Sequence, residues 1–373
     1  MSCCKIDQTT AKELVETAQQ LCSPGKGLLD LDESFGKMKT RFQTFGVEST
    51  DVSLYRSTLL TTPELSTYVS GVSLNEDAVS EGGELCKRSG LIFGVKVYSD
   101  FEPLPMSSGE TVTVGLDGLS SRCRQYYESG ARFAKWCAVM KISDNKCPSP
   151  LALQENCRDL ARFAAIAQAN RLVPVLEVKV VAEGEEDIDT CAFFTEKMLS
   201  HCFKALNDHH VVLEGCLLKP DMITHGVKCG KKCGAEDIAY YTLRTLQRTV
   251  PPALVGVTFR TGNQTEEEAA ANLSALNKMS DTRKPWTLTH FYSRPLTNSF
   301  LKTWGGNSSN LKSAQSTFLE SVQNMSNAQK GNYQPTAAAP KAVVTTTQVE
   351  QTKTVYTTVQ PTEVSERMRV QGS

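Results

Sequence analysis

Residues 211–220 read VVLEGCLLKP, an apolar run that ends on Lys219. Residues 172–180 read LVPVLEVKV and carry Glu177 and Lys179 inside a second apolar run. Continuous apolar runs are typical of parallel strands that are buried on both faces, whereas half-exposed strands alternate apolar and polar side chains. Both stretches therefore predict strands of a parallel sheet, and both place charged side chains where burial is costly unless they are paired.

Apolar runs recur along the chain and alternate with helical patterns. Besides residues 172–180 and 211–219, strands are predicted at residues 28–32, 68–74, 91–97, 133–142, 254–260 and 286–292. Helices are predicted at residues 156–169, 192–206, 236–250 and 266–276. This alternation predicts an α/β fold, a closed (βα)8 TIM barrel. An open doubly wound sheet is the alternative. No G-x-G-x-x-G motif follows the first strand, which weakens the dinucleotide-binding form of that sheet.

Two segments lie outside the repeating pattern. An extra N-terminal helix is predicted to begin at Thr10 and Glu13, which have capping-box spacing, and to end at the breaker cluster of residues 23–25. From residue 331 onward the sequence is rich in Thr, Ala, Gln and Val, which is typical of a flexible low-complexity segment. We therefore expect a single barrel domain at residues 1–330 and a flexible tail at residues 331–373.

The composition limits the kinds of partner and the compartment. With 40 Lys and Arg against 41 Asp and Glu, the net charge is -1, which gives no overall attraction to nucleic acid or to an anionic membrane. We expect no membrane span, and the first residues, MSCCKIDQTT, show no secretion signal. The 13 cysteines are scattered, as expected for a reduced cytoplasmic protein rather than a disulfide framework.

The sequence offers few ligands for a metal ion. It contains 5 histidines, and His209 and His210 are adjacent rather than at ligand spacing. Cys229 and Cys233 could form half of a metal site, but no second pair accompanies them. We therefore expect neither a metal nor another cofactor, and a zinc-dependent mechanism is disfavoured.

Charged side chains stand near the carboxyl ends of predicted strands, where barrel enzymes place their active sites. The candidates are Asp32, Lys135, Glu177, Lys179 and Lys219. Burial disfavours the ammonium form of a lysine and so yields a nucleophilic amine, which can attack a ketone and form an imine. A protonated imine withdraws electrons, so a neighbouring carbon–carbon bond can break while carboxylates move the protons. The alternative is that each lysine extends from its strand end into water.

Residues 213–222, LEGCLLKPDM, resemble the imine-lysine signature of the class I fructose-bisphosphate aldolases. Further matching motifs are PGKG (24–27), DES (32–34), GLDGL (115–119), FAKW (133–136), ALNDHH (205–210), RTVPPA (248–253), QTEEEA (264–269) and LKTWGG (301–306). The resemblance runs in order over residues 8–333 and is more specific than any single motif. It implies a cytoplasmic, homotetrameric lyase of glycolysis. Such an enzyme cleaves the sugar phosphate fructose 1,6-bisphosphate reversibly to dihydroxyacetone phosphate and glyceraldehyde 3-phosphate.

The resemblance implies a role for each catalytic candidate. Lys219 forms the imine with the ketone, and Asp32 takes the hydroxyl proton that starts cleavage of the carbon–carbon bond. Glu177 acts as acid and base while the carbinolamine forms and loses water. Lys135 supplies positive charge beside the reacting centre.

The resemblance also implies which residues bind the phosphates. Arg294 holds the phosphate nearest the ketone, together with the backbone N–H of Gly262 and the turn that Thr261 begins. Ser34 and Arg41 match positions near the other end of the substrate.

Several positions near the expected site depart from the family pattern. Cys137 stands where the family has arginine, Ser99 where it has lysine, and Lys179 where it has a second carboxylate. Asp30 replaces an alanine, and Lys37 replaces a small polar residue. The changes of charge cancel, so we expect anion binding to be retained. The loss of a carboxylate at position 179 alters the proton transfers that are available.

Two further departures concern the phosphate turn and the tail. Arg260 precedes the turn, and Asn263 replaces a glycine in it. The family's tail ends in a tyrosine that helps proton transfer at the imine, and Tyr356 is the candidate for that role in this chain.

Two functions follow from the sequence. The retained residues Lys219, Asp32, Glu177, Lys135 and Arg294 favour an active aldolase. The alternative is a catalytically weakened paralogue kept for binding or assembly, which the changed residues favour. If the distal phosphate site is weakened by the changes at positions 99 and 137, preference shifts toward fructose 1-phosphate.

Overall fold

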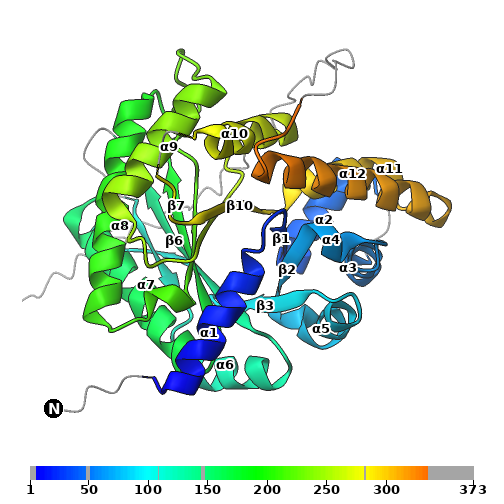
Figure 1. Cartoon of the computed structure of the whole chain (residues 1–373), viewed down its shortest axis with the longest axis horizontal. Coiled ribbons are helices and arrows are strands. Elements are labelled where there is room, and N and C mark those ends of the chain that lie inside the picture. Colours follow the sequence, from blue (N-terminus) through cyan, green and yellow to red (C-terminus); the bar gives the residue numbers. More distant parts are fainter. Residues whose placement is uncertain (1–5, 48–50, 108, 144–147, 281–282, 335–373) are drawn as a thin grey trace, which may run out of the picture. The chain divides into compact units, whose positions relative to one another are not determined.

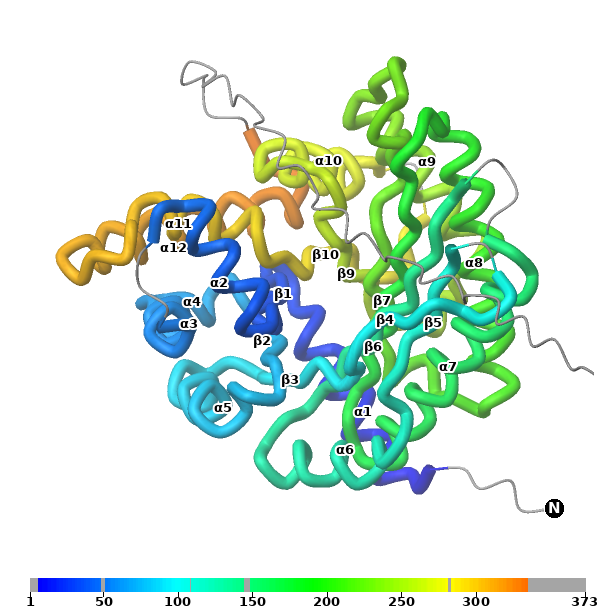
Figure 2. The backbone as a smooth tube through the Cα atoms, turned by 180° about the vertical axis from the view of Figure 1, so that it is seen from behind, coloured from blue at the N-terminus to red at the C-terminus, as the bar shows by residue number. Residues whose placement is uncertain are grey.

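Eight parallel strands close into a barrel, in the order β1-β10-β9-β8-β7-β6-β3-β2. The structure is a computed structural model that describes residues 6–47, 51–107, 109–143, 148–280 and 283–334. Figure 1 shows the helices outside the strands, with α7, α8 and α9 along one side and α3, α5 and α12 along the other. Figure 2 shows the same ring from behind. The predicted (βα)8 barrel with an extra N-terminal helix is confirmed.

The barrel strands are short and almost wholly buried. They are β1 (Gly27–Leu31), β2 (Val69–Leu74), β3 (Ile92–Lys96), β6 (Phe133–Lys141), β7 (Val173–Val181), β8 (Leu217–Pro220), β9 (Gly256–Phe259) and β10 (Thr287–Tyr292). In the register of β6, β7 and β8, Cys137 lies opposite Glu177, and Glu177 lies opposite Lys219. The strand register therefore brings residues far apart in the sequence to one level of the barrel.

The longer helices cover the strands from outside. They are α1 (Gln8–Leu21), α2 (Phe35–Thr44), α3 (Val52–Leu60), α5 (Val79–Arg88), α6 (Leu119–Glu128), α7 (Pro150–Ala169), α8 (Ile188–Asp208), α9 (Ala235–Thr249), α10 (Glu266–Lys278), α11 (Arg294–Trp304) and α12 (Leu311–Gln329). Helix α10 has the capping box expected of its sequence, with Thr265 and Glu268 bonded reciprocally. A short helix, α4 (Leu65–Tyr68), leads into β2.

Three local predictions were wrong. Helix α1 is capped by Asp7, whose side chain accepts from the Thr10 N–H, so the helix begins before the predicted capping box. The first half of the predicted strand at residues 211–219 is a 3-10 turn at Leu213–Gly215. The chain between β3 and α6 forms a hairpin of β4 (Asp100–Pro103) and β5 (Thr111–Val114) that the apolar pattern did not predict.

The described residues fall within one compact unit, Met1–Pro335. From residue 335 on, the predicted tail lies outside the described residues, and Tyr356 lies there as well. Among the helices that the structure describes, none is long and apolar enough to cross a membrane.

Candidate active site

The barrel interior has an apolar layer beneath a charged one. Side chains on one face of a strand recur every second residue, so Phe133 shares a face with Lys135, and Leu217 with Lys219. The apolar layer packs against α1 and consists of Leu28, Phe133, Val175, Leu217 and Phe291. The charged layer is formed by Asp30, Asp32, Lys135, Glu177 and Lys219. The carboxyl half of the barrel therefore holds a cluster of charges above an apolar floor.

Lys219 is 2% exposed, and its amine is surrounded by carboxylates and an aromatic ring. Its Nζ donates to Asp30 Oδ2 at 2.6 Å and lies 3.3 Å from Glu177 Oε2. The same nitrogen lies 4.0 Å from the centroid of the Phe291 ring. A cation over a ring face is attracted by the ring quadrupole. These three contacts hold the amine of Lys219 at the centre of the cluster.

Lys135 joins the carboxylates from the neighbouring side. Its Nζ lies 2.6 Å from Asp32 Oδ2, 2.8 Å from Asp30 Oδ2 and 3.5 Å from Glu177 Oε2. Burial by itself lowers the pKa of Lys135, but the charges of Asp30, Asp32 and Glu177 outweigh burial and hold the pKa well above its ordinary value. Lys135 is therefore a permanent cation in the site.

Asp30 in β1 and Asp32 just after it differ in their protonation. Burial and the nearby charge of Asp30 raise the pKa of Asp32 to about 6, although Lys135 acts in the opposite direction. Burial also acts to raise the pKa of Asp30, but Lys135 and Lys219 outweigh it and hold that pKa well below its usual range. Ser73 Oγ donates to Asp32 Oδ2 at 2.7 Å. Asp30 thus stays ionised, while Asp32 can gain and lose a proton near neutral pH.

Glu177 is held from its other side by an arginine. Arg260 Nε lies 2.7 Å from Glu177 Oε1, and Arg260 Nη1 lies 2.9 Å from Asp221 Oδ2. Burial acts to raise the pKa of Glu177, but the charges of Lys219, Lys135 and Arg260 prevail and lower it to about 2. The guanidinium fixes one oxygen of Glu177 and leaves the other toward the amine of Lys219.

This arrangement defines a class of protein. A buried amine inside an α/β barrel, in contact with carboxylates that can move protons, is suited to a lyase that binds a carbonyl substrate as an imine. The floor of apolar side chains and the low exposure of the cluster keep bulk water away from the amine.

Comparisons with known proteins specify the family within that class. The family described as Glycolytic: Fructose-bisphosphate aldolase class-I matches residues 13–354. The chain belongs to the class I fructose-bisphosphate aldolases, and it is a lyase of glycolysis that cleaves fructose 1,6-bisphosphate. The family and the activity expected from the sequence are thereby confirmed.

The relatives match over most of their length. Fructose-bisphosphate aldolase 1 of Toxoplasma gondii is 48% identical over 88% of this chain and 93% of its own. The cytosolic fructose-bisphosphate aldolase 4 of Arabidopsis thaliana is 46% identical over 86% of this chain and 84% of its own. A solved structure of the Plasmodium falciparum aldolase, in complex with TRAP and a small molecule inhibitor, superposes with a TM-score of 0.86. It is 41% identical and covers 89% of this chain and 98% of that one.

The predicted phosphate-binding residues lie apart from the buried cluster. Arg294 begins α11, is 70% exposed and pairs with Glu33 Oε1 at 3.3 Å. Arg41 is buried and also pairs with Glu33, at 2.9 Å from Oε2, while it donates to Thr297 Oγ1. Ser34 precedes α2 as its N-cap residue. Glu33 thus links both arginines to the turn that follows Asp32.

The turn after β9 carries the other two predicted phosphate residues. Thr261 O accepts a hydrogen bond from the backbone N–H of Gln264 at 3.2 Å. Gly262 has a φ of +60°, in the left-handed region that favours glycine. Arg260 precedes this turn directly, so the turn is anchored to the charged cluster through the contact with Glu177.

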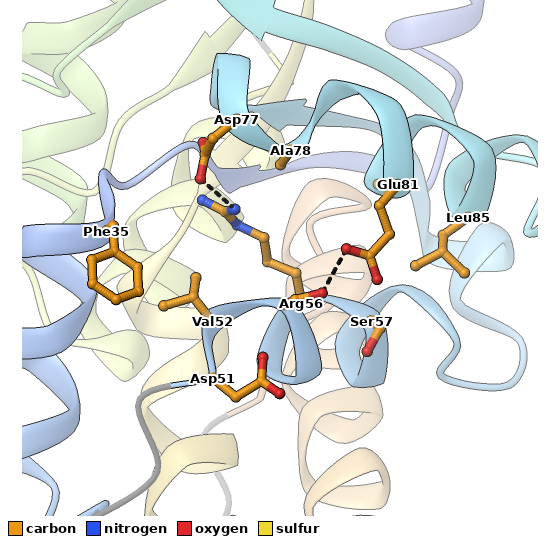
Figure 3. A pocket seen from close by; sticks show the side chains of 11 residues that line it. Phe35, Asp51, Val52, Arg56, Ser57, Asp77, Ala78, Glu81 and Leu85 are labelled. Carbon is orange, nitrogen blue, oxygen red and sulfur yellow. Dashed lines mark hydrogen bonds and ion pairs between the residues drawn. The ribbon is translucent and has the colours of Figure 1, made fainter.

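A cavity of about 280 Å³ lies beside the barrel, where residues of α2, α3 and α5 meet. Figure 3 shows the side chain of Arg56 reaching toward Asp77, with Nη1 3.1 Å from Oδ2. Arg56 Nη2 also donates to the backbone oxygen of Glu33 at 3.2 Å. The predicted catalytic residues do not line this cavity. Arg56 therefore ties the turn after Asp32 to α3.

Two residues of the cluster had no role in the sequence analysis. Asp30 was identified only as a departure from the family pattern, and Arg260 only as the residue before a turn. The period of two along a strand could have placed Asp30 on the same face as Asp32. No local signal points Arg260 at Glu177, because the contact depends on how β7 and β9 sit beside β8. In the described ranges, no group of His, Cys, Asp and Glu is arranged to hold a metal ion.

Proposed function

We propose that Lys219 is the residue that forms the imine in this aldolase, with Glu177, Asp32 and Lys135 as its catalytic partners. The observation that carries the proposal is the position of Lys219 Nζ, which is buried and lies 3.3 Å from Glu177 Oε2. The amine attacks the ketone carbon, and Glu177 passes a proton between nitrogen and oxygen until the oxygen leaves as water. Glu177 suits this role because its second oxygen is fixed by Arg260.

Asp32 is the group that takes the hydroxyl proton in the cleavage step. When the carbon–carbon bond breaks, its electron pair moves to the protonated imine and leaves a neutral enamine, while the hydroxyl proton passes to Asp32. A pKa of about 6 suits a group that must be ionised before the step and protonated after it. Lys135 lies 2.6 Å from Asp32, and its positive charge stabilises the ionised carboxylate.

The remaining assignments concern phosphate binding and assembly. Arg294, Thr261 and Gly262 hold the phosphate nearest the ketone, and Ser34 and Arg41 lie near the distal end. The exposed fraction of Arg294 leaves its guanidinium free to turn from Glu33 to a phosphate, a stronger bidentate partner. The chain is a homotetramer of the cytoplasm, with a single barrel domain at residues 1–330. From residue 335 on, the expected tail lies outside the described residues. The location is supported by relatives whose names include cytosolic and cytoplasmic forms.

The departures at Lys179, Cys137 and Ser99 favour the second candidate function, a weakened aldolase kept for binding. The two candidates differ in whether the imine forms at all.

Borohydride trapping separates them. The wild-type chain and Lys219→Ala are treated with dihydroxyacetone phosphate and borohydride, and the peptides are analysed by mass spectrometry. The proposal expects an adduct on Lys219 that is missing from the variant. If the wild-type chain forms no adduct at saturating ligand, the imine assignment is wrong and the weakened-paralogue function takes its place.

A further inference from the structure

Asp30 occupies a position that the catalytic roles above leave unexplained. Its side chain reaches into the charged layer from β1, and one oxygen, Oδ2, accepts from both Lys219 Nζ at 2.6 Å and Lys135 Nζ at 2.8 Å. The Lys219 contact is shorter than the 3.3 Å between that amine and Glu177. Asp30 is therefore the carboxylate closest to the reacting nitrogen.

The surroundings of this carboxylate are almost dry. Both lysines that Asp30 contacts, Lys135 and Lys219, are 2% exposed. Glu177, the other carboxylate near Lys219, is held by Arg260 through its other oxygen.

We propose that Asp30 is a catalytic residue of this chain: its carboxylate is the counter-ion of the protonated imine on Lys219. The proposal rests on Lys219 as the imine-forming residue. Asp30 thereby joins the catalytic residues assigned above, because its carboxylate contacts the nitrogen of Lys219.

The chemistry of imine formation explains what a counter-ion contributes. The ammonium of Lys219 and the ketone become a protonated imine and one water. A nitrogen–carbon bond forms and the carbon–oxygen double bond breaks. The nitrogen loses two protons, and both leave with the oxygen as water. The nitrogen carries one positive charge before and after. A carboxylate fixed 2.6 Å from it stabilises both cations relative to the neutral amine, imine and enamine.

Within the described residues, the charged groups near Asp30 lie on β6, β7 and β8 and just after the end of β1. Lys135 on β6 and Lys219 on β8 touch its carboxylate, and Asp32 and Glu177 bind the same lysines. Arg260 reaches this group only through Glu177. Because Lys135 and Lys219 keep the pKa of Asp30 well below its usual range, its own protonation does not interfere across the pH range of the test.

The test measures the pH at which the imine loses its proton. Enzyme saturated with dihydroxyacetone phosphate is treated with cyanoborohydride, which reduces the protonated imine in preference to the neutral one, from pH 6 to pH 10. The modified fraction of Lys219 is measured by mass spectrometry in the wild-type chain, in Asp30→Ala and in Asp30→Asn.

Removal of the counter-ion disfavours the cation, so the midpoint of trapping moves to lower pH in Asp30→Ala and Asp30→Asn, by about one to three units. Asp30→Asn keeps the shape of the side chain, so it carries the test if Asp30→Ala fails to fold. Loss of a merely structural contact lowers the melting temperature but leaves the midpoint where it was.

Each other outcome overturns a definite part of the proposal. If the wild-type chain forms the adduct but both single variants keep the wild-type midpoint, Asp30 is not the counter-ion. The assignment of Lys219 as the imine-forming residue is then unaffected. No adduct on Lys219 in the wild-type chain refutes the imine assignment and the counter-ion together.

Discussion

Arg260→Leu is the substitution that most directly tests how this site is held together. Arg260 lies between Glu177 and Asp221, at 2.7 Å and 2.9 Å, and these side chains are 7% and 18% exposed. Removal of one partner from a buried ion pair leaves the other charge without compensation and costs about 3–5 kcal/mol. We expect a loss of that size in the free energy of unfolding at pH 7.5, measured by urea denaturation.

The same substitution should lower activity through geometry rather than through protonation. The pKa of Glu177 rises from about 2 when Arg260 is lost, but Lys219 and Lys135, whose effects on it are larger, remain. Glu177 therefore stays ionised at neutral pH but loses the group that orients it. We expect kcat/KM for fructose 1,6-bisphosphate to fall by about 10²-fold, since misplacement of a catalytic group by about 1 Å has that effect. The loss should be constant between pH 7 and pH 8.5, above the pKa of Asp32.

A second substitution provides the control. Cys137 lies opposite Glu177 in the register of β6 and β7, at the position where the family has arginine. Adding Cys137→Arg to Arg260→Leu should recover at least about 10-fold of the lost kcat/KM, because a guanidinium again lies beside the carboxylate. Unchanged kcat/KM and stability in Arg260→Leu would refute this reasoning. A loss that disappears at high pH would show that protonation, not orientation, was changed.

His290 gives the protein an acid-sensitive core, because burial lowers its pKa from 6.5 to about 3 and, within the described part of the chain, neither ring nitrogen has a hydrogen-bond partner. Between these pH values the unfolded chain binds a proton that the folded chain does not. The free energy of unfolding should therefore fall by about 2–3 kcal/mol between pH 6.5 and pH 4.5 through this residue. Urea denaturation of His290→Leu should show a smaller fall, and equal falls would contradict the argument. If Ser99 and Cys137 stand where cations of the distal phosphate site would be, as the resemblance implies, catalytic efficiency should favour fructose 1-phosphate. Ser99→Lys should shift the ratio of kcat/KM values back toward the bisphosphate, and a strong bias to the bisphosphate in the wild-type chain would refute the preference.

The fold was predictable because most barrel strands are apolar on both faces. The runs at residues 91–97, 133–142 and 286–292 match β3, β6 and β10 to within one residue at each end. The strand predicted at residues 211–219 was too long. Glu214 and Gly215 lie among apolar residues but belong to a turn, and a pattern of apolar residues alone does not show this. The β4–β5 hairpin was missed because each strand has only four residues, most of β4 is exposed, and most of β5 is only half-buried.

The candidate site could be predicted only in part. The residues that could be predicted lie near the carboxyl ends of strands. Lys219, Glu177, Lys135 and Asp32 stand where barrel chemistry is expected, so each could be found from its own neighbourhood in the sequence. The partnership of Asp30 with Lys219 joins residues 189 positions apart and depends on the closure of β1 against β10, β9 and β8. Local sequence gives the candidates, and only the closed barrel says which of them meet.

The contact between α1 and the apolar floor has a consequence for the order of events. Leu14, Ala18 and Leu21 of α1 pack with Leu28, Phe133 and Leu217, which plugs the barrel at the end remote from the charged layer. If Lys219 forms the imine, as proposed, the ketone fragment stays bonded to it after the carbon–carbon bond breaks, while the aldehyde fragment is free. We therefore expect the two products to leave one after the other, the aldehyde before the ketone.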